Sequence, residues 1–199
     1  GQLDLFVGGR VLAGRWPEAA SSLLFRGAGD GWVLDHENTK ILEQAGLVSG
    51  AVFSDIDGDG DADLVLACEW GSVRIFRNTK GKFKEATVEL GLDQFKGCWN
   101  GVAIGDFNGD GRFDIVASNL GRNTRYEGHR AKPLEVFFGN FSGDESIEII
   151  EAYHDSRLQK VVPERQLDFL GKAMPFLRTR FTSHLAYGRL GVEEILGEK

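Results

Sequence analysis

A nine-residue pattern of acidic side chains occurs twice in this chain and limits what it can fold into. Residues 55–63 read D-I-D-G-D-G-D-A-D, and residues 106–114, 51 positions later, read D-F-N-G-D-G-R-F-D. Both copies carry oxygen-bearing side chains at positions 1, 3, 5 and 9 and a glycine at position 6. Carboxylates about 4 Å apart repel each other by roughly 1 kcal/mol in water, and by more near a protein surface. The pattern is therefore either a solvated acidic run or the lining of a cation site.

The spacing favours the cation site. Alternate residues can point inward around an ion where the chain turns tightly, which a glycine at position 6 allows. The pattern also recurs in register with the same apolar flanks, which solvated charge runs do not require. Calcium takes about six to eight oxygen ligands, so we expect calcium rather than magnesium in both loops. The expected ligand residues are Asp55, Asp57, Asp59, Asp61 and Asp63 in one loop and Asp106, Asn108, Asp110, Arg112 and Asp114 in the other.

Each loop is predicted to join two β-strands. Position 12, which in an EF-hand is a bidentate glutamate at the start of a helix, is apolar in both copies. Short apolar runs rich in β-branched residues precede and follow each loop, as in buried strands. Asp63 and Asp114 should close the site from the start of the second strand. Position 7 (Asp61 or Arg112) should contribute a backbone carbonyl, because an arginine side chain cannot bind a cation.

The self-similarity extends beyond the loops. Residues 24–26 followed by Trp32 match residues 75–77 followed by Phe83, again 51 positions apart, and both read as hairpins. One unit therefore runs strand, metal loop, strand, hairpin and strand, with a linker such as residues 39–46 leading to the next. Four antiparallel strands in about 50 residues are typical of a propeller blade.

Two further segments belong to the same series. Residues 4–7 resemble residues 63–66, so the chain is expected to begin just after a lost loop. The segment Asn140–Glu148 aligns with the metal loops, but Glu145 replaces the glycine of position 6 and two acids are replaced. We expect this third loop to be empty, because a glutamate disfavours the left-handed turn. A hairpin at 147–162 should follow it.

The fold class predicted is mainly β: a partial β-propeller of about three four-stranded antiparallel blades with a short helical C-terminal segment. Residues 1–162 are assigned to the blades and residues 163–199 to the helical segment. In that segment Leu167, Leu170 and Met174 share one helical face, Pro175 ends the helix, and a second helix should reach Gly188.

Composition excludes some classes of function. The formal net charge is −7 and the basic residues are scattered, which excludes an extended nucleic-acid surface. No apolar run is long enough for a transmembrane segment. Cys68 and Cys98 could form a disulfide or remain two free thiols. Since the chain opens with Gly1 rather than methionine, we expect a piece of a longer protein, whose end blades would expose faces that favour self-association.

With the loops, their flanks and the repeat length established, residues 1–160 resemble the FG-GAP or VCBS-type repeat, the calcium-binding propeller blade. The residues around Arg10–Pro17, Trp99–Gly101 and Asn119–Arg125 are further similar to bacterial cartilage-acidic-protein/ASPIC–UnbV-type proteins. The resemblance implies a bacterial protein that is secreted, periplasmic or on the outer surface. It implies blades made rigid by calcium, and no catalysis.

Two functions of different classes are consistent with this pattern. The first is a non-catalytic binding or scaffold module that presents loops to a protein or glycan. The second is the propeller portion of a secreted glycan-active enzyme. The sequence has no nucleophile elbow, HExxH or phosphate loop, which favours the first. Because strands alternate in direction, the ligand surface is expected at the blade end opposite the metal loops, at Glu69, Trp70, Trp99, Asn100, Asn119, Arg122 and Asn123.

Overall fold

The computed structural model describes residues 3–120, 132 and 134–197. The chain divides into two compact units, Gly1–Thr124 and Arg125–Lys199. The sequence predicts a domain boundary after residue 162, where strands give way to helices. In the structure the last sheet belongs with the C-terminal helices, because they share one hydrophobic core.

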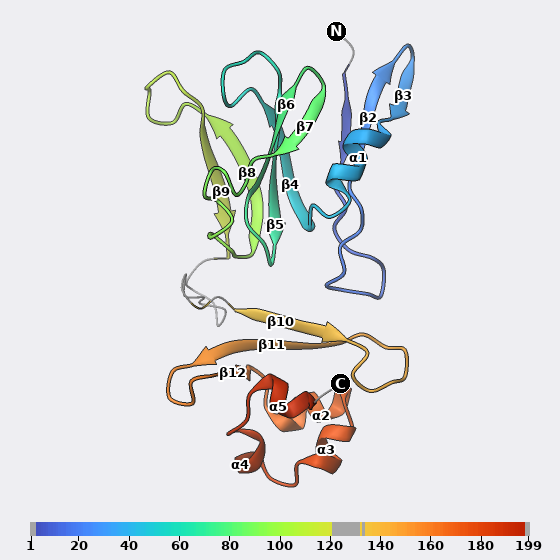
Figure 1. Ribbon diagram of the computed structural model, residues 1–199, viewed down its shortest axis with the longest axis vertical. Coiled ribbons are helices and arrows are strands. Elements are labelled where there is room, and N and C mark those ends of the chain that lie inside the picture. The colour runs from blue at the N-terminus through green and yellow to red at the C-terminus, as the bar shows by residue number, and fades with distance from the viewer. Residues whose placement is uncertain (1–2, 121–131, 133, 198–199) are drawn as a thin grey trace. The chain divides into compact units, whose positions relative to one another are not determined.

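The prediction of a mainly β protein is confirmed, and the strands form four small antiparallel sheets (Figure 1). The first unit contains β1 (Leu5–Val7), β2 (Leu23–Ala28), β3 (Gly31–Leu34), β4 (Leu47–Ser54), β5 (Asp63–Glu69), β6 (Arg74–Thr79), β7 (Lys82–Glu85), β8 (Trp99–Gly105) and β9 (Asp114–Asn119). Their sheets are β1-β2-β3, β4-β5-β6-β7 and β8-β9. The second unit contains β10 (Glu135–Gly139), β11 (Glu148–Asp155) and β12 (Lys160–Pro163) in that order.

The expectation of about three four-stranded blades needs correction. Only β4–β7 has four strands among the described residues, in the predicted order of strand, loop, strand and hairpin. The first sheet lacks the strand that would precede β1, and the β8-β9 sheet has two strands. The repeat is therefore present three times in the first unit, but one copy alone is complete.

The pairing registers establish the repeat in space. Leu5 pairs with Phe25 as Leu64 pairs with Phe76, which confirms that β1 corresponds to β5. The β4-β5 and β8-β9 pairs also share an irregularity near their start, where the register shifts just before Gly50 and just before Gly101. Because the bulge occurs at the same place in both strand pairs, it is a regular part of the repeat and not a local irregularity.

The sheets of the first unit share two hydrophobic cores. Leu64 and Leu66 of β5 pack with Leu24 and Leu42 of the preceding repeat, whereas Val65, on the other face of β5, packs against Val102 and its neighbours in β8-β9. Because successive side chains of a strand point to opposite faces, β5 is buried on both sides. This explains its uninterrupted apolar sequence.

The outer faces of this series are more exposed. Leu5 and Val7 on β1 are 39% and 44% exposed, and Val116 on β9 is 52% exposed, although its counterpart Val65 is fully buried. These faces have the character expected of end blades. Self-association of the chain through them stays a prediction.

A short helix, α1 (His36–Leu42), occupies part of the segment expected to be a linker. The carboxylate of Asp35 accepts a hydrogen bond from the backbone N–H of Asn38, which caps the helix, and pairs with the Arg26 guanidinium at 2.5 Å. Burial favours the neutral acid, but these hydrogen bonds outweigh it and hold the pKa of Asp35 below its ordinary value. Leu42 then points into the core shared with β5.

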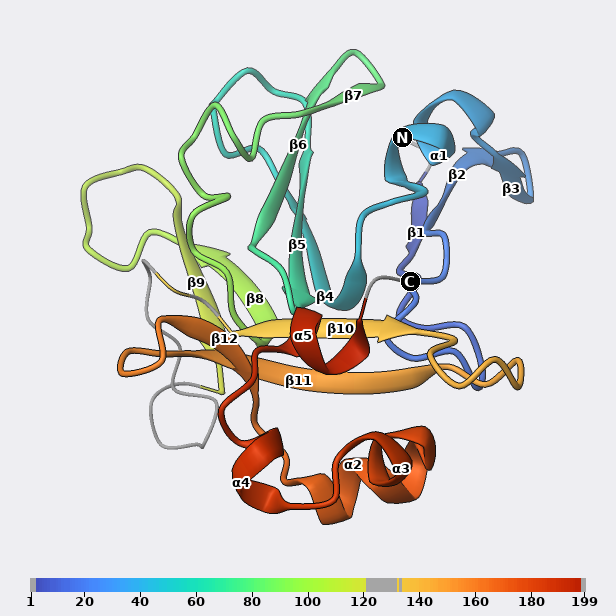
Figure 2. The ribbon, with the colours of Figure 1, turned by 60° about the horizontal axis from the view of Figure 1, so that its bottom comes forward.

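In the second unit, helices α2 (Leu167–Ala173), α3 (Phe176–Arg180), α4 (His184–Tyr187) and α5 (Val192–Leu196) accompany the sheet. Figure 2 shows α2, α3 and α4 gathered on one side of β10–β12. The predicted hairpin β11-β12 and the helix before Pro175 are confirmed. The second predicted helix is split into α3 and α4, because the chain extends at Phe181 and Ser183. Leu167, Leu170 and Met174 are buried with Ile150 and Ala152 of β11.

Two smaller expectations concern the cysteines and the membrane. Cys68 and Cys98 are not joined in a disulfide, and the buried Cys68 thiol donates to the carbonyl of Ala45 at 3.2 Å. Burial raises the pKa of Cys68 to about 11, so this thiol is not reactive near neutral pH. Within the described part of the chain, no helix combines the length and apolarity needed to cross a bilayer.

The close approach of β4 and β8 gives the first prediction. A Cβ added at Gly50 would lie 3.0 Å from the Cα of Gly101, against backbone that cannot move aside freely. We expect Gly50→Ala to lower the free energy of unfolding by about 1–3 kcal/mol, as overpacking does. Gly31→Ala is the matched control, since its Cβ would meet nothing within 4 Å. Urea denaturation of both variants measures the difference, and equal stabilities would contradict the contact.

Candidate metal centre

The loop between β4 and β5 is organised by the carboxylate of Asp55. It accepts hydrogen bonds from the backbone N–H groups of Gly58, Asp59 and Gly60, at 2.8, 3.0 and 3.0 Å. Gly58 and Gly60 have φ angles of +79° and +92°, in the left-handed region that favours glycine. The loop therefore closes into a tight ring around one face of Asp55.

Asp63 ties this ring to the sheet. It begins β5, as predicted, and its side chain is completely buried. One carboxylate oxygen accepts from the backbone N–H of Ile56 at 3.1 Å, and the other from the N–H of Asn78 in β6 at 2.8 Å. Loop, β5 and β6 thus meet at a single carboxylate.

The loop brings three carboxylates together. Carboxylate oxygens of Asp55, Asp57 and Asp63 all lie within 4.8 Å of one another, near enough to share one cation. Burial raises the pKa of Asp63 above its ordinary value, and the charges of Asp57 and Asp59 act in the same direction. The hydrogen bonds from Asn78 and Ile56 oppose this shift without reversing it. A cation would offset the accumulated charge, and all-oxygen donors suit a hard ion such as calcium.

The other two predicted ligands of this loop lie outside that group of three. The carboxylate of Asp59 accepts from the backbone N–H of Asp61 at 2.9 Å, and that of Asp61 accepts from the N–H of Lys80 at 2.6 Å. Their side chains therefore shape the loop and join it to the β6-β7 turn. A role for the Asp61 carbonyl stays a prediction.

The loop between β8 and β9 repeats the arrangement around Asp106. Its carboxylate accepts from the N–H groups of Gly109, Asp110 and Gly111 at 2.7, 3.1 and 2.9 Å, and Asp114 at the start of β9 accepts from Phe107 at 3.0 Å. The bond from Gly111, with those from Gly109 and Asp110, holds the pKa of Asp106 below its ordinary value.

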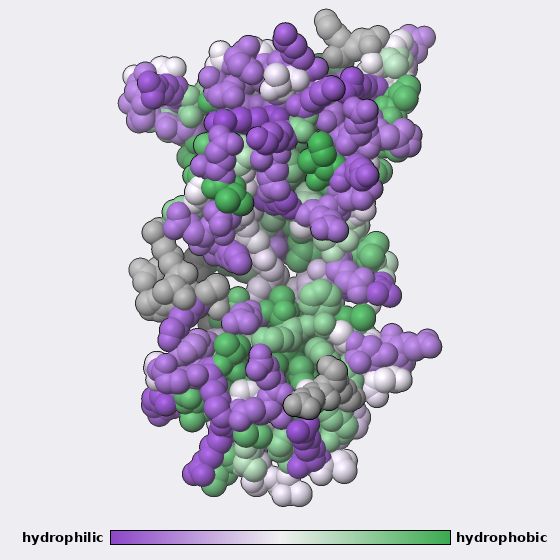
Figure 3. All heavy atoms as spheres, viewed as in Figure 1, coloured by the Kyte–Doolittle hydropathy of each residue, from purple (hydrophilic) through white to green (hydrophobic). Residues whose placement is uncertain are grey.

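This second loop is more open than the first. Asn108 replaces the aspartate of position 3, and its amide donates to Asp110 at 3.3 Å, while Arg112 donates its backbone N–H to Asp110 at 2.9 Å. Phe107 and Phe113 are 60% and 53% exposed. Figure 3 shows the hydrophilic surface over this loop. It carries two carboxylates fewer, so its attraction for a cation is weaker.

The third loop keeps the turn of the other two although a glutamate stands at its position 6. Asn140 accepts from the N–H of Gly143 at 2.6 Å, and the Glu148 carboxylate accepts from Phe141 at 2.7 Å, as Asp55 and Asp63 do in the first loop. Glu145 adopts φ +69°, where the other loops have glycine, although a glutamate disfavours this region. That this loop holds no ion stays a prediction.

Of the residues expected to form a ligand surface, Glu69, Trp99 and Asn119 lie at the strand ends opposite the metal loops. Leu47 pairs with Glu69, and Trp99 pairs with Asn119. Ser49 joins the two sheets there by donating to the carbonyl of Trp99 at 2.5 Å. Arg122 and Asn123 lie outside the described residues.

Their side chains differ in what they do. The indole N–H of Trp99 donates to the Phe95 carbonyl at 3.0 Å, and the amide of the exposed Asn100 donates to Cys98 at 3.3 Å, so both support local structure. Trp70 has φ +52°, and its half-buried ring meets Trp16 edge-on with ring centroids 6.4 Å apart. Glu69 pairs with the Arg10 guanidinium.

Sequence reasoning missed one charged group beside the first loop. Arg77 of β6 places its guanidinium 3.6 Å from the Asp57 carboxylate, and its Nε is buried without a hydrogen bond. The repeat carried a signal for it, since Arg26 occupies the same position 51 residues earlier and pairs with Asp35. A base at this position balances part of the loop's negative charge.

The two position-9 aspartates differ in burial, and this gives a second prediction. Asp63→Ala would leave two backbone N–H groups without their acceptor in a buried site, which should lower stability by about 2–4 kcal/mol. Asp114→Ala, at a partly exposed carboxylate, should lower it by about 1 kcal/mol. Chemical denaturation with a chelator present measures both without any metal contribution. Equal losses would show that burial at Asp63 does not matter.

Comparison with known proteins finds a family likeness for this region. Residues 55–117 match the FG-GAP-like repeat, and the match runs from the first residue of one loop into the strand that follows the other. No curated protein and no solved structure matches the chain. The matched segment, which includes β5 to β8, most of β9 and both acidic loops, is similar to the FG-GAP-like repeat, and this likeness suggests a β-propeller-type binding module.

Proposed function

We propose that this chain is a non-catalytic binding module whose repeats are stabilised by calcium and whose loops are presented to a protein or glycan partner. The observation that carries the proposal is the three-carboxylate group of Asp55, Asp57 and Asp63 within the FG-GAP-like match. Their charges repel one another, and Asp63 is completely buried, so a cation bound between them would be favourable. A module of this kind holds its loops in a fixed position for a partner and does not catalyse a reaction.

Calcium would serve stability in this module. Asp55, Asp57 and Asp63 would hold the ion in the first loop, and Asp106, Asn108, Asp110 and Asp114 in the second. Because each loop joins two strands and Asp63 also binds the N–H of Asn78 in β6, neutralising the loop strengthens the sheet. We infer a secreted, periplasmic or surface location, since extracellular calcium is abundant enough for weak sites of about 10⁻⁴ to 10⁻³ M.

Calcium dependence is the third prediction. With a Kd near 10⁻⁴ M, about 10 mM calcium should stabilise the folded chain by about 2.7 kcal/mol per site, and a chelator should remove this. Calorimetric titration should count two sites, with Asp57→Asn and Asp110→Asn each weakening one. Asp30→Asn is the control, since Asp30 is an exposed acid in the β2-β3 turn. A melting temperature unchanged by calcium and chelator would overturn the calcium assignment.

The partner surface is proposed at the end of the strands opposite the metal loops, centred on Trp70. A non-glycine residue in the left-handed region is strained by about 1 kcal/mol or more, and such strain concentrates at functional positions. Trp16 supports the Trp70 ring at its edge, and Arg10 and Glu69 supply polar groups beside it. Aromatic rings flanked by hydrogen-bonding groups suit a sugar or a peptide.

The fourth prediction tests this surface. On glycan and peptide arrays, Trp70→Ala and Trp70→Gly should both lose a partner bound by the parent chain, with calcium affinity unchanged. The glycine variant relieves the backbone strain, so its melting temperature should not fall, which separates recognition from folding. Trp32→Ala, at a tryptophan 58% exposed elsewhere in the unit, is the control. Binding that survives both Trp70 variants would place the partner surface elsewhere.

A further inference from the structure

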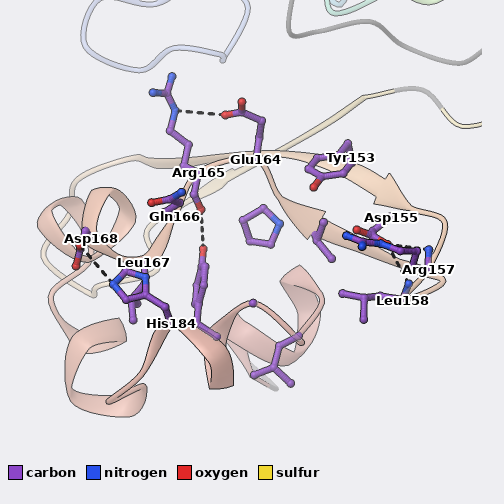
Figure 4. Close-up of a pocket in the computed structure, with 15 residues that line it drawn as sticks. Tyr153, Asp155, Arg157, Leu158, Glu164, Arg165, Gln166, Leu167, Asp168 and His184 are labelled. Atoms are coloured by element: carbon purple, nitrogen blue, oxygen red, sulfur yellow. Dashed lines mark hydrogen bonds and ion pairs between the residues drawn. The ribbon is translucent and has the colours of Figure 1, made fainter.

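The second unit contains a hollow that the metal loops do not use. It lies among the β11-β12 hairpin, the start of α2 and helix α4, and its volume is about 710 Å³ (Figure 4). Ligand sites in proteins are typically clefts of about 300–1,000 Å³ with an apolar lining and a few placed polar groups. Every residue that lines this hollow belongs to the unit Arg125–Lys199.

The floor of the hollow is apolar and fixed. Val162, Leu167 and Tyr187 line it and are at most 7% exposed. The Tyr187 hydroxyl donates to the carbonyl of Arg165 at 3.0 Å, and burial raises the pKa of this phenol, so it stays neutral. This hydrogen bond joins α4 to the segment before α2 and keeps the floor in place.

The two ends of the hollow carry polar side chains that face the solvent. Figure 4 shows Asp168 and His184 at one end and Asp155 and Arg157 at the other. The His184 ring nitrogen lies 3.4 Å from the Asp168 carboxylate, and both side chains are more than half exposed, at 60% and 73%. Gln166, also exposed, lies between Asp168 and the centre of the hollow.

The lining carries charged side chains of both signs. The carboxylate of Asp155, which accepts the backbone N–H groups of Arg157 and Leu158, has the Arg157 charge nearby, and Asp168 lies beside His184. Arg165 is engaged with the carboxylates of Glu151 and Glu164 at 3.3 and 4.0 Å. A ligand with a strong charge of either sign would meet like charges in this lining. The lining therefore suits an uncharged ligand.

An uncharged ligand that uses this lining must both donate and accept hydrogen bonds. Carboxylates accept, guanidinium groups donate, and the Gln166 amide does both, so neighbouring hydroxyl groups of a sugar match all of them. The exposed ring of Tyr153 and the apolar floor offer surfaces on which the C–H face of a sugar packs. The volume of about 710 Å³ accommodates a short oligosaccharide.

A peptide added as a strand fits less well. Such recognition uses the backbone hydrogen bonds of a free sheet edge. In β12, Pro163 has no N–H group, and a Cβ on Gly191 would lie 3.1 Å from the Val161 carbonyl oxygen, so the chain before α5 lies against this strand. Recognition in the hollow therefore depends on side chains.

We propose that the hollow formed by the β11-β12 hairpin, α2 and α4 is a binding site for a neutral oligosaccharide. The polar ends orient its hydroxyl groups, and Tyr153 with the apolar floor receives its ring faces. The site goes beyond the proposed function, since it lies in the second unit and uses none of the metal-loop residues.

The experiment titrates the full chain with neutral trisaccharides, namely maltotriose, cellotriose, mannotriose and tri-N-acetylchitotriose, and follows binding by calorimetry and by NMR shifts. At least one should bind, and Asp168→Asn and Gln166→Ala should each weaken it by about tenfold or more, as expected for loss of a ligand hydrogen bond. Both side chains are exposed, so the fold should persist, which thermal melting verifies. Glu193→Gln, at an exposed acid of α5 outside the hollow, is the control and should bind normally.

Three results would overturn the proposal. The first is absence of binding by every trisaccharide at about 10 mM, well above the range of weak sites. The second is selective binding of a sulfated or phosphorylated sugar or of a peptide, which would show that the mixed charges do not set the ligand class. The third is equal weakening by Glu193→Gln and the two lining variants, which would place the sugar elsewhere.

Discussion

The carboxylate that begins the second strand of each repeat holds this structure together. Asp63 accepts the N–H of Ile56 in its loop and of Asn78 in the next strand, and Asp4 accepts from Gly27, the residue 51 positions before Asn78. One side chain thus fixes a loop, the strand that leaves it and the strand beside that one. Such bonds to a charged acceptor are stronger than neutral ones. The repeat therefore depends on an acid at this position in both copies, at the buried Asp63 and at the exposed Asp4.

The same bond explains why the third loop survives the loss of its glycine. Glu148, one methylene longer than aspartate, still reaches the N–H of Phe141, and Asn140 still accepts from Gly143. These bonds fix both ends of the loop, so Glu145 is held at φ +69° despite the strain. The preference of a non-glycine residue against the left-handed region amounts to about 1 kcal/mol. The hydrogen bonds around the loop together contribute more than this, so they decide the conformation.

The repeated elements were predictable from the sequence, and the differences between the copies were not. The offset of 51 located both loops and the complete blade, and the likeness of residues 4–7 to residues 63–66 located β1, because each rests on local side chains. Helix α1 was missed because its cause is a single cap: Asp35 accepts from Asn38, whereas the matching Ala86 has no acceptor, and only a turn follows it. The grouping of β10–β12 with the helices depends on packing among Ile150, Met174 and Ile195. No sequence motif predicts this packing.

In the candidate metal site, too, the sequence predicts which residues could bind a cation, but it does not predict how buried or how charged their surroundings are. The spacing of acids identifies the residues able to face a cation, yet it makes the two loops look equivalent. In the structure Asp63 is fully buried in the complete sheet and Asp57 lies near Arg77, whereas the second loop has Asn108 in place of that aspartate and belongs to a two-stranded sheet. Charge repulsion and burial are both greater in the first loop, so a bound cation relieves more unfavourable energy there. The first loop is therefore the stronger candidate for a structural ion, and the difference comes from the sheet around it rather than from the nine residues themselves.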